Sequence, residues 1–134
     1  MDIGINMKTL LLILSLLLIT TNAYAEWTFY GASVTDAVYF YDKSTIKRNG
    51  DKVKVWEYIN YSPDDKKAKS INVSSQRTLS EIDCVNETYK GLSMQNFTEQ
   101  DLKGDMIDVP PNRTPTYIPP DVTYAVLMKL VCKK

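Results

Sequence analysis

Two cysteines, Cys84 and Cys132, are the only ones in the chain, and they constrain the fold more than any other feature. A pair of cysteines can bind metal, react, or join two distant segments. Zinc takes about four ligands, and the sequence contains no histidine, so a metal role is disfavoured. A reactive thiolate usually needs a histidine to accept its proton, and the acidic neighbour Asp83 opposes a thiolate at Cys84. Whether the two cysteines instead join distant segments depends on the cellular compartment of the protein.

The N-terminal segment, residues 1–25, has the layout of a secretory signal peptide. A lysine precedes an apolar run from Leu10 to Ile19, and small residues lead to a cleavage site after Ala25. The run is shorter than the roughly 18 apolar residues that span a bilayer, so we expect no transmembrane helix. Cleavage would leave residues 26–134 as an exported protein, either periplasmic or secreted.

In an oxidising compartment, an even pair of cysteines is most simply a disulfide. Closing so long a loop would stabilise the fold by about 4 kcal/mol in the chain-entropy model. We expect one small domain over residues 26–134. Glu26 stands where a lipid-modified cysteine would be, so no lipid anchor is expected. The chain carries 16 basic and 16 acidic residues, and this balance argues against nucleic acid or an anionic membrane as a partner.

Aromatic and β-branched residues predict strands in the first half of the domain. We expect strands at residues 26–33 and 37–46 and a third at residues 53–61. Asn49-Gly50 is a strong hairpin signal because both residues tolerate positive φ. The third strand should therefore pair antiparallel with the second. The charged segment at residues 62–69 is expected to be a solvated turn.

The second half of the domain should add two or three strands between residues 70 and 100, with Gly91 at a bend or bulge. The proline-rich segment at residues 109–121 should cross the surface as an extended chain, because proline cannot donate to a sheet ladder. A proline-rich ligand for a recognition module is the alternative interpretation of this segment.

The last segment is predicted to be a helix that begins at Pro120 and Asp121. Helical spacing would place five residues on one face, namely Tyr124, Leu127, Met128, Val131 and Cys132. A strand is the rival interpretation, because alternate residues from Tyr124 to Cys132 are also apolar. In the helical interpretation, Cys132 ties the helix to the strand that carries Cys84.

The order of these motifs resembles the surface-adhesin protein E family of exported bacterial proteins. The motifs are Trp27, then "YFYDKSTI", "VKVWEYINY", "SEIDC" with "TYK" after it, a proline-bearing segment and Cys132. The resemblance implies an α+β domain, in which a single antiparallel sheet packs against a C-terminal helix tied to it by one disulfide. The best-known members are lipid-anchored at the outer surface and bind host matrix or serum proteins. This chain departs from them in lacking the lipid-modified cysteine.

We therefore expect a non-enzymatic, adhesin-like binding domain whose partner is an extracellular matrix or serum protein. No catalytic residue, metal ligand or cofactor site is expected, because the chain lacks histidine and a glycine-rich phosphate loop. Glu81 and Asp83 should share one strand face, where we interpret them as solvated or salt-bridged side chains. The alternative function is a periplasmic envelope accessory or structural protein without a host ligand.

The binding candidates are Trp56, Tyr58 and Lys54, since aromatic rings and a lysine stem on one strand face can bury area while their polar ends stay hydrated. Most aromatic residues belong to cores, so a second interpretation stays open. In it, Trp56 and Tyr58 lie in the core, while Val53, Val55 and Ile59 face a partner or the helix.

The domain also contains several Asn-x-Ser/Thr sequons, which mark N-glycosylation only in a eukaryotic secreted protein. Their asparagines are Asn60, Asn72, Asn86, Asn96 and Asn112. A biased genome in an organism that never glycosylates them is the other explanation, and the family resemblance favours it.

Overall fold

One antiparallel sheet of eight strands forms the body of the domain in the computed structural model, which describes residues 4–17 and 25–133. The path through the sheet is β1-β2-β4-β5-β6-β7, with β3 paired to β4 and β8 paired to β6. The strands are β1 (Trp27–Ala32), β2 (Val38–Asp42), β3 (Lys47–Asn49), β4 (Lys52–Asn60), β5 (Ser75–Asp83), β6 (Thr88–Phe97), β7 (Met106–Val109) and β8 (Thr116–Tyr117). The predicted single antiparallel sheet is confirmed.

The described residues also form three α-helices, namely α1 (Met7–Leu17), α2 (Lys66–Ser70) and α3 (Thr123–Val131). The first lies in the expected signal segment. No helix in the described part of the chain is long and apolar enough to cross a membrane. The end of the apolar run and most of the segment before the predicted cleavage site lie outside the described residues.

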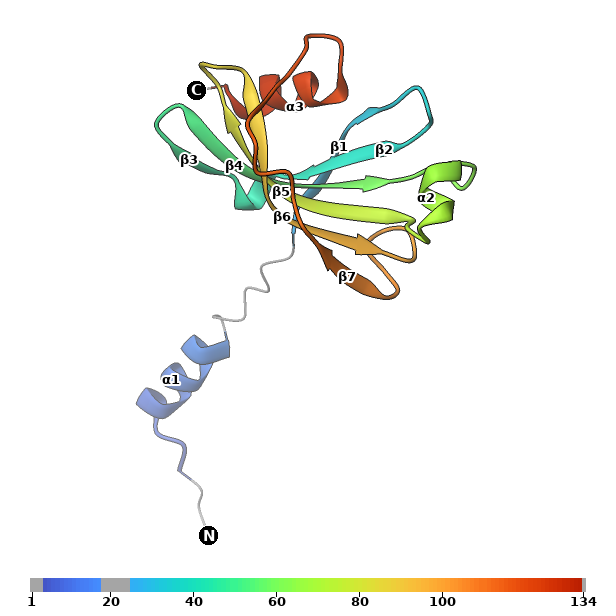
Figure 1. Cartoon of the computed structure of the whole chain (residues 1–134). Coiled ribbons are helices and arrows are strands. Elements are labelled where there is room, and N and C mark those ends of the chain that lie inside the picture. The colour runs from blue at the N-terminus through green and yellow to red at the C-terminus, as the bar shows by residue number, and fades with distance from the viewer. Residues whose placement is uncertain (1–3, 18–24, 134) are drawn as a thin grey trace.

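The C-terminal helix packs on one face of the sheet and completes the core there (Figure 1). The helical interpretation of this segment is confirmed, and the strand alternative is wrong. Apolar side chains at helical spacing meet the inward residues of the sheet, where β4 and β5 alternate. The buried core residues of this contact are Val53, Val55, Ile82, Ile118, Ala125, Leu127 and Val131.

The start of α3 differs from the prediction, because Asp121 does not cap it. The N-cap is Val122, which makes no side-chain cap hydrogen bond, and the helix begins at Thr123. The predicted inward face is otherwise correct. Leu127 and Val131 are fully buried, and Tyr124 packs against the core from its edge.

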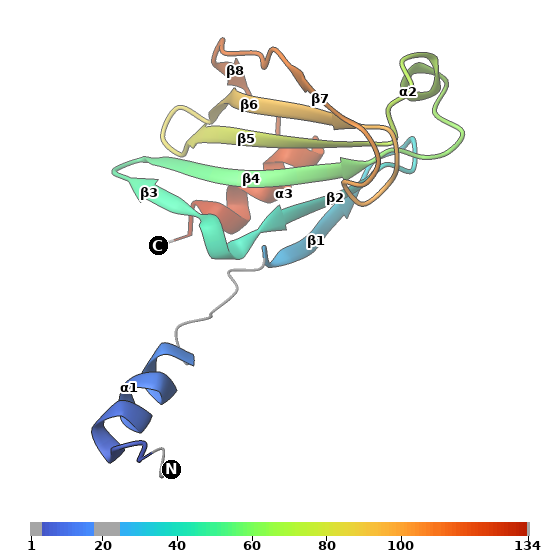
Figure 2. The ribbon, with the colours of Figure 1, turned by 90° about the horizontal axis from the view of Figure 1, so that it is seen from below.

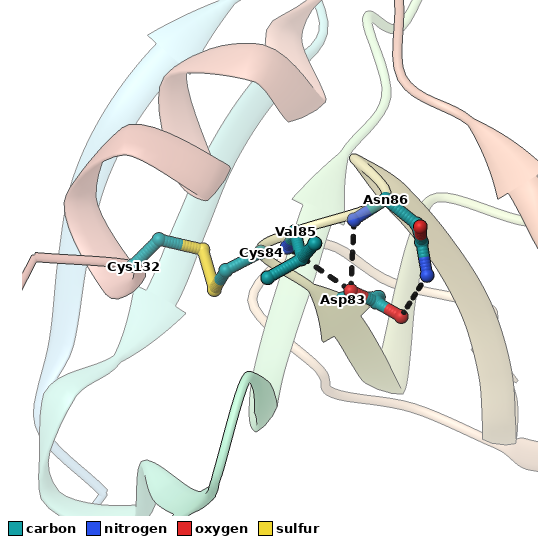
Figure 3. The surroundings of a disulfide bond; sticks show 5 residues. All are labelled: Asp83, Cys84, Val85, Asn86 and Cys132. Atoms are coloured by element: carbon teal, nitrogen blue, oxygen red, sulfur yellow. Dashed lines mark hydrogen bonds between the residues drawn. A yellow bond between two sulfur atoms is a disulfide. The ribbon is translucent and has the colours of Figure 1, made fainter.

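The disulfide joins Cys84 to Cys132, with 5.8 Å between their Cα atoms (Figure 3). Cys84 follows β5, and Cys132 is the C-cap residue of α3, so the bond ties the helix to the sheet as expected. Asp83 shapes the turn that presents Cys84. Its carboxylate accepts hydrogen bonds from the backbone N–H groups of Val85 and Asn86, and from the Asn86 side chain.

The hairpin at Asn49-Gly50 joins β4 to the short strand β3, whereas we expected it to follow the second strand directly. The predicted strand at residues 37–46 is too long, because β2 ends at Asp42. The Asp42 carboxylate accepts hydrogen bonds from Ser44 and Thr45 and so caps a 3-10 turn between β2 and β3. β2 nevertheless pairs antiparallel with β4 as predicted.

The charged segment after β4 contains a short helix that we did not expect, since it was interpreted as a turn. α2 begins after Asp65, whose carboxylate accepts a hydrogen bond from the backbone N–H of Ala68. The buried Ala68 holds this helix against the domain. Five residues are too few for periodicity to reveal a helix, so only the cap could have signalled it.

Gly91 lies at the bulge predicted for this strand. Opposite β5, Ser80 pairs with Gly91 and Leu79 pairs with Ser93, so Leu92 is the extra residue. The proline-rich segment crosses over this point as an extended chain, and the Gly91 N–H donates to the Asn112 carbonyl at 2.7 Å. A Cβ atom on Gly91 would lie only 2.9 Å from the Pro111 Cβ atom.

Replacing Gly91 with alanine should lower the free energy of unfolding by about 1–3 kcal/mol, because the new methyl group would push the crossing segment away. Urea unfolding followed by circular dichroism would measure the change. Gly31→Ala is the matched comparison, because its Cβ would meet only the Thr123 side chain at 3.2 Å. Equal costs for the two variants would show that the Pro111 contact is not what Gly91 preserves.

Candidate functional site

The three predicted binding residues share the face of the sheet that points away from α3, which we call the outer face. Opposite them on β5, Lys54 pairs with Glu81, Trp56 with Leu79, and Tyr58 with Arg77. Figure 2 views the sheet from this side, with α3 behind it. Val53 and Val55 occupy two inward positions of β4 and face the helix, as the second interpretation placed them, while Trp56 and Tyr58 lie on the opposite face.

Aromatic rings from three strands gather on the outer face. The Tyr58 ring stacks on Phe40 with 4.5 Å between centroids, and Trp27 meets Tyr58 edge-on at 4.8 Å. Phe29 extends the group to β1 and is 58% exposed. Tyr58 itself is only 7% exposed, because its aromatic neighbours cover it. The ring of Tyr58 therefore supports this surface more than it presents itself to a partner.

Trp56 is held by a cation–π contact. The Arg77 guanidinium lies 5.3 Å from the centroid of the Trp56 ring and 5.6 Å from that of Phe97. Its Nε donates a hydrogen bond to the Gln95 side-chain carbonyl at 3.0 Å. Such a contact is worth about 0.5–1 kcal/mol at an exposed site. Trp56 is half-buried and positioned before any partner arrives, which reduces the entropy lost on binding.

The loop between β6 and β7 folds over one end of the outer face (Figure 2). Asn60 and Asp101 exchange two hydrogen bonds, of 2.8 and 2.9 Å, and the Leu102 N–H donates to the Ser75 hydroxyl at 3.1 Å. Burial raises the pKa of Tyr58, and the charge of Asp101 raises it further. The aromatic surface is thus bounded by a fixed polar loop.

The opposite end of the outer face is charged. Lys52 and Lys90 lie 3.9 and 3.5 Å from the Glu81 carboxylate. Lys54 is exposed, and within residues 25–133 no carboxylate comes within salt-bridge distance of its ammonium group. Glu81 and Asp83 share this face as expected. One forms ion pairs and the other forms the turn, so neither is arranged as a catalytic acid or base.

Glu57 is the feature that sequence reasoning missed. It lies on the inward face of β4, is 1% exposed, and accepts a hydrogen bond from the Tyr30 hydroxyl at 2.6 Å. The Tyr124 hydroxyl donates to its other oxygen. Burial raises the pKa of Glu57 to about 7, although both hydrogen bonds act in the opposite direction. One carboxyl group therefore links β1, β4 and α3.

The sequence did contain a signal for Glu57. It stands between Val55 and Ile59 in the alternation of β4, at a position where its neighbours are apolar. Tyr30 reaches it because of a bulge in β1, where Phe29 pairs with Phe40 and Gly31 with Tyr39. Alternation alone cannot predict a bulge, so the partner of Glu57 could not be named.

Comparisons with known proteins agree with this fold. A family model described as "Surface-adhesin protein E" matches residues 27–133. The chain belongs to the surface-adhesin protein E family. Among curated protein sequences, none is significantly similar to it.

Solved structures of Haemophilus influenzae protein E share the fold of this family member. Crystal form II superposes with a TM-score of 0.61 at 15% identity, covering 84% of this chain and 91% of that one. A second structure of the H. influenzae protein gives a TM-score of 0.59 at the same identity, covering 84% and 87% of the two chains. Protein E from non-typeable H. influenzae gives 0.56 at 15% identity, with 84% and 78% covered. The helix packed on the sheet and the α+β class are confirmed.

Membership in this family identifies an adhesin-like, exported protein, in agreement with the N-terminal segment. In the described residues, no group of three or more His, Cys, Asp or Glu side chains is arranged to hold a metal ion. Cleavage after Ala25 remains a prediction. The assignment of Trp56, Tyr58 and Lys54 as binding residues also remains a prediction.

Proposed function

We propose that the domain is a non-enzymatic, adhesin-like module that binds a protein partner through the outer face of its sheet. The residues that contact the partner are Trp56, Lys54 and Phe29, with Tyr58 as support beneath them. The partner class is an extracellular matrix or serum protein, as the family resemblance implies.

The observation that carries this proposal is the composition of the outer face. α3 packs on the other side, and no helix within residues 25–133 covers this one (Figure 2). Aromatic residues and arginine are the types enriched at the centres of protein interfaces. Trp56 and Arg77 supply both at the centre of the sheet, and the exposed Phe29 and Lys54 extend the surface in two directions.

The residue changes that test this are Trp56→Ala, Phe29→Ala and Lys54→Ala in the exported form, with binding measured on immobilised matrix and serum proteins. Trp56→Ala should weaken binding at least tenfold, as central aromatic residues do. Lys54→Ala should have a smaller effect that fades at high salt, because a charge at the rim acts mainly on the association rate. At Tyr58 the change is to phenylalanine and not to alanine, because phenylalanine keeps the packed ring.

Val126→Ala is the matched control, because Val126 is also exposed but lies on α3, away from the outer face. It should leave binding unchanged. Folded outer-face variants that bind like the unmodified protein would place the binding surface elsewhere. Loss of binding in the Val126 variant would do the same.

Location separates this function from that of a periplasmic accessory protein. Antibody labelling of intact cells is expected if the domain is displayed to a host ligand. Labelling only after the outer membrane is permeabilised would favour the envelope protein without a host ligand.

A further inference from the structure

A cavity of about 240 Å³ lies on the helix side of the sheet, away from the outer face. It opens between the middle strands, the start of α3 and the crossing proline-rich segment. The lining residues that matter here are Glu57, Thr78, Ser80, Tyr89, Met94 and Asn112. This volume is below the range of about 300–1,000 Å³ typical of drug-sized ligands, so it suits a smaller molecule.

The floor of the cavity is polar where a sheet facing a helix is normally apolar. On β5 the inward residue Ile82 belongs to the core, but the next inward positions are Ser80 and Thr78. Both are buried, and Gln76 continues the row into the cavity lining. A polar row at inward positions weakens the core, and a bound polar ligand would offset that loss.

Glu57 lies in this floor without a cation to balance it. The titratable side chains that face it are all tyrosines, namely Tyr30 on β1, Tyr39 and Tyr41 on β2, Tyr61 after β4 and Tyr124 on α3. None of them can carry a positive charge. Within the described domain, no lysine or arginine lies within salt-bridge distance of it. A buried carboxyl group must hold a proton or find a positive partner.

We propose that this cavity binds a small organic cation, an ammonium or guanidinium group on a short apolar stem, whose charge pairs with the Glu57 carboxylate. The hydroxyls of Thr78 and Ser80 accept the remaining N–H donors. Tyr89 stacks on Tyr124 with 4.3 Å between centroids, and this pair forms an aromatic wall for the stem. Cations favour such aromatic surroundings.

Binding is coupled to proton release. In the empty cavity, Glu57 holds a proton below about pH 7, because burial raises its pKa. When the cation enters, the Glu57 hydroxyl loses this proton to the solvent and the carboxylate forms the ion pair. Each cation bound therefore releases up to one proton, and charge in the cavity is balanced.

Benzylammonium and its neutral counterpart benzyl alcohol are the probes for the exported form. An NMR titration near pH 6 should show benzylammonium binding at least tenfold more tightly, with amide shifts around Gly91 and Tyr124. Calorimetry in two buffers of different ionisation enthalpy should show release of close to one proton. Equal affinities for the two probes would overturn the proposal, as would binding without proton release.

Glu57→Gln should weaken benzylammonium binding at least tenfold while Glu81→Gln, the same change on the outer face, leaves it within twofold. Met94→Phe is a second test that keeps Glu57 and fills the cavity. Met94→Phe should abolish binding in a folded protein, even if the Glu57→Gln variant does not fold. Unchanged binding in Met94→Phe would overturn the proposal. Neither result bears on the outer face, so the proposed adhesive function stands or falls separately.

Discussion

Loss of the Cys84–Cys132 disulfide should lower the free energy of unfolding by about 2–5 kcal/mol, a large part of the total for a domain of this size. The bond spans 48 positions, so cutting it frees a long loop in the unfolded chain. The folded state should keep its helix docked, because Leu127 and Val131 still pack in the core. The double variant Cys84→Ser/Cys132→Ser should therefore remain folded but melt roughly 10 °C lower or more.

Urea unfolding of the oxidised protein, the reduced protein and the double serine variant would measure this effect. The reduced protein and the variant should agree within about 1 kcal/mol, since both lack only the crosslink. Mass analysis should find the oxidised form about 2 Da lighter, with a peptide joining the two cysteines. Two free thiols in protein from an oxidising compartment, or equal stability of oxidised and reduced forms, would contradict the prediction.

The stability of the domain should also fall as the pH rises from about 4.5 through 7, and Glu57 should be the cause. Its pKa is near 4.5 in the unfolded chain and about 7 in the folded one. Between these values the folded state holds the extra proton, so raising the pH favours unfolding. The contribution is fully present below pH 4.5 and amounts to about 3 kcal/mol.

Histidine does not contribute to the pH dependence in this window. The chain has no histidine, the side chain that ordinarily changes charge there. Hydrogen bonds lower the pKa of Asp83. Burial raises the pKa of Asp42, but its hydrogen bonds outweigh burial and lower that pKa as well. Both carboxyl groups therefore titrate below this window. Glu57→Gln should flatten the dependence of unfolding free energy on pH. If the variant and the unmodified protein lose stability in parallel, Glu57 does not titrate in this window.

Much of the fold could be predicted because the decisive patterns are local. The alternation of β4, the helical spacing from Tyr124 to Cys132 and the glycine at the bulge each depend on neighbours in sequence. Boundaries were less accurate where a side chain caps a turn. Asp42 ended β2 early, whereas Asp121 failed to cap α3, and only the surrounding structure distinguishes these two aspartates.

The candidate site was predicted in part, because alternation says which residues share a face but not what covers it. Trp56 and Tyr58 do lie together, yet Tyr58 is covered by Trp27 from β1, a contact between distant segments. Glu57 was hidden for the same reason. Its two hydroxyl partners come from β1 and α3, and no local pattern connects them.

The two outermost strands also bear on whether the sheet can grow. An open edge presents unpaired backbone groups to which another chain can add, and this is how fibres and aggregates begin. The bulge at Tyr30 twists β1, a feature that natural sheets use against such addition. β7 carries Asp108 and is followed directly by two prolines, which cannot donate to a new ladder. Crowded among other exported chains, the domain is therefore guarded against polymerising along its sheet.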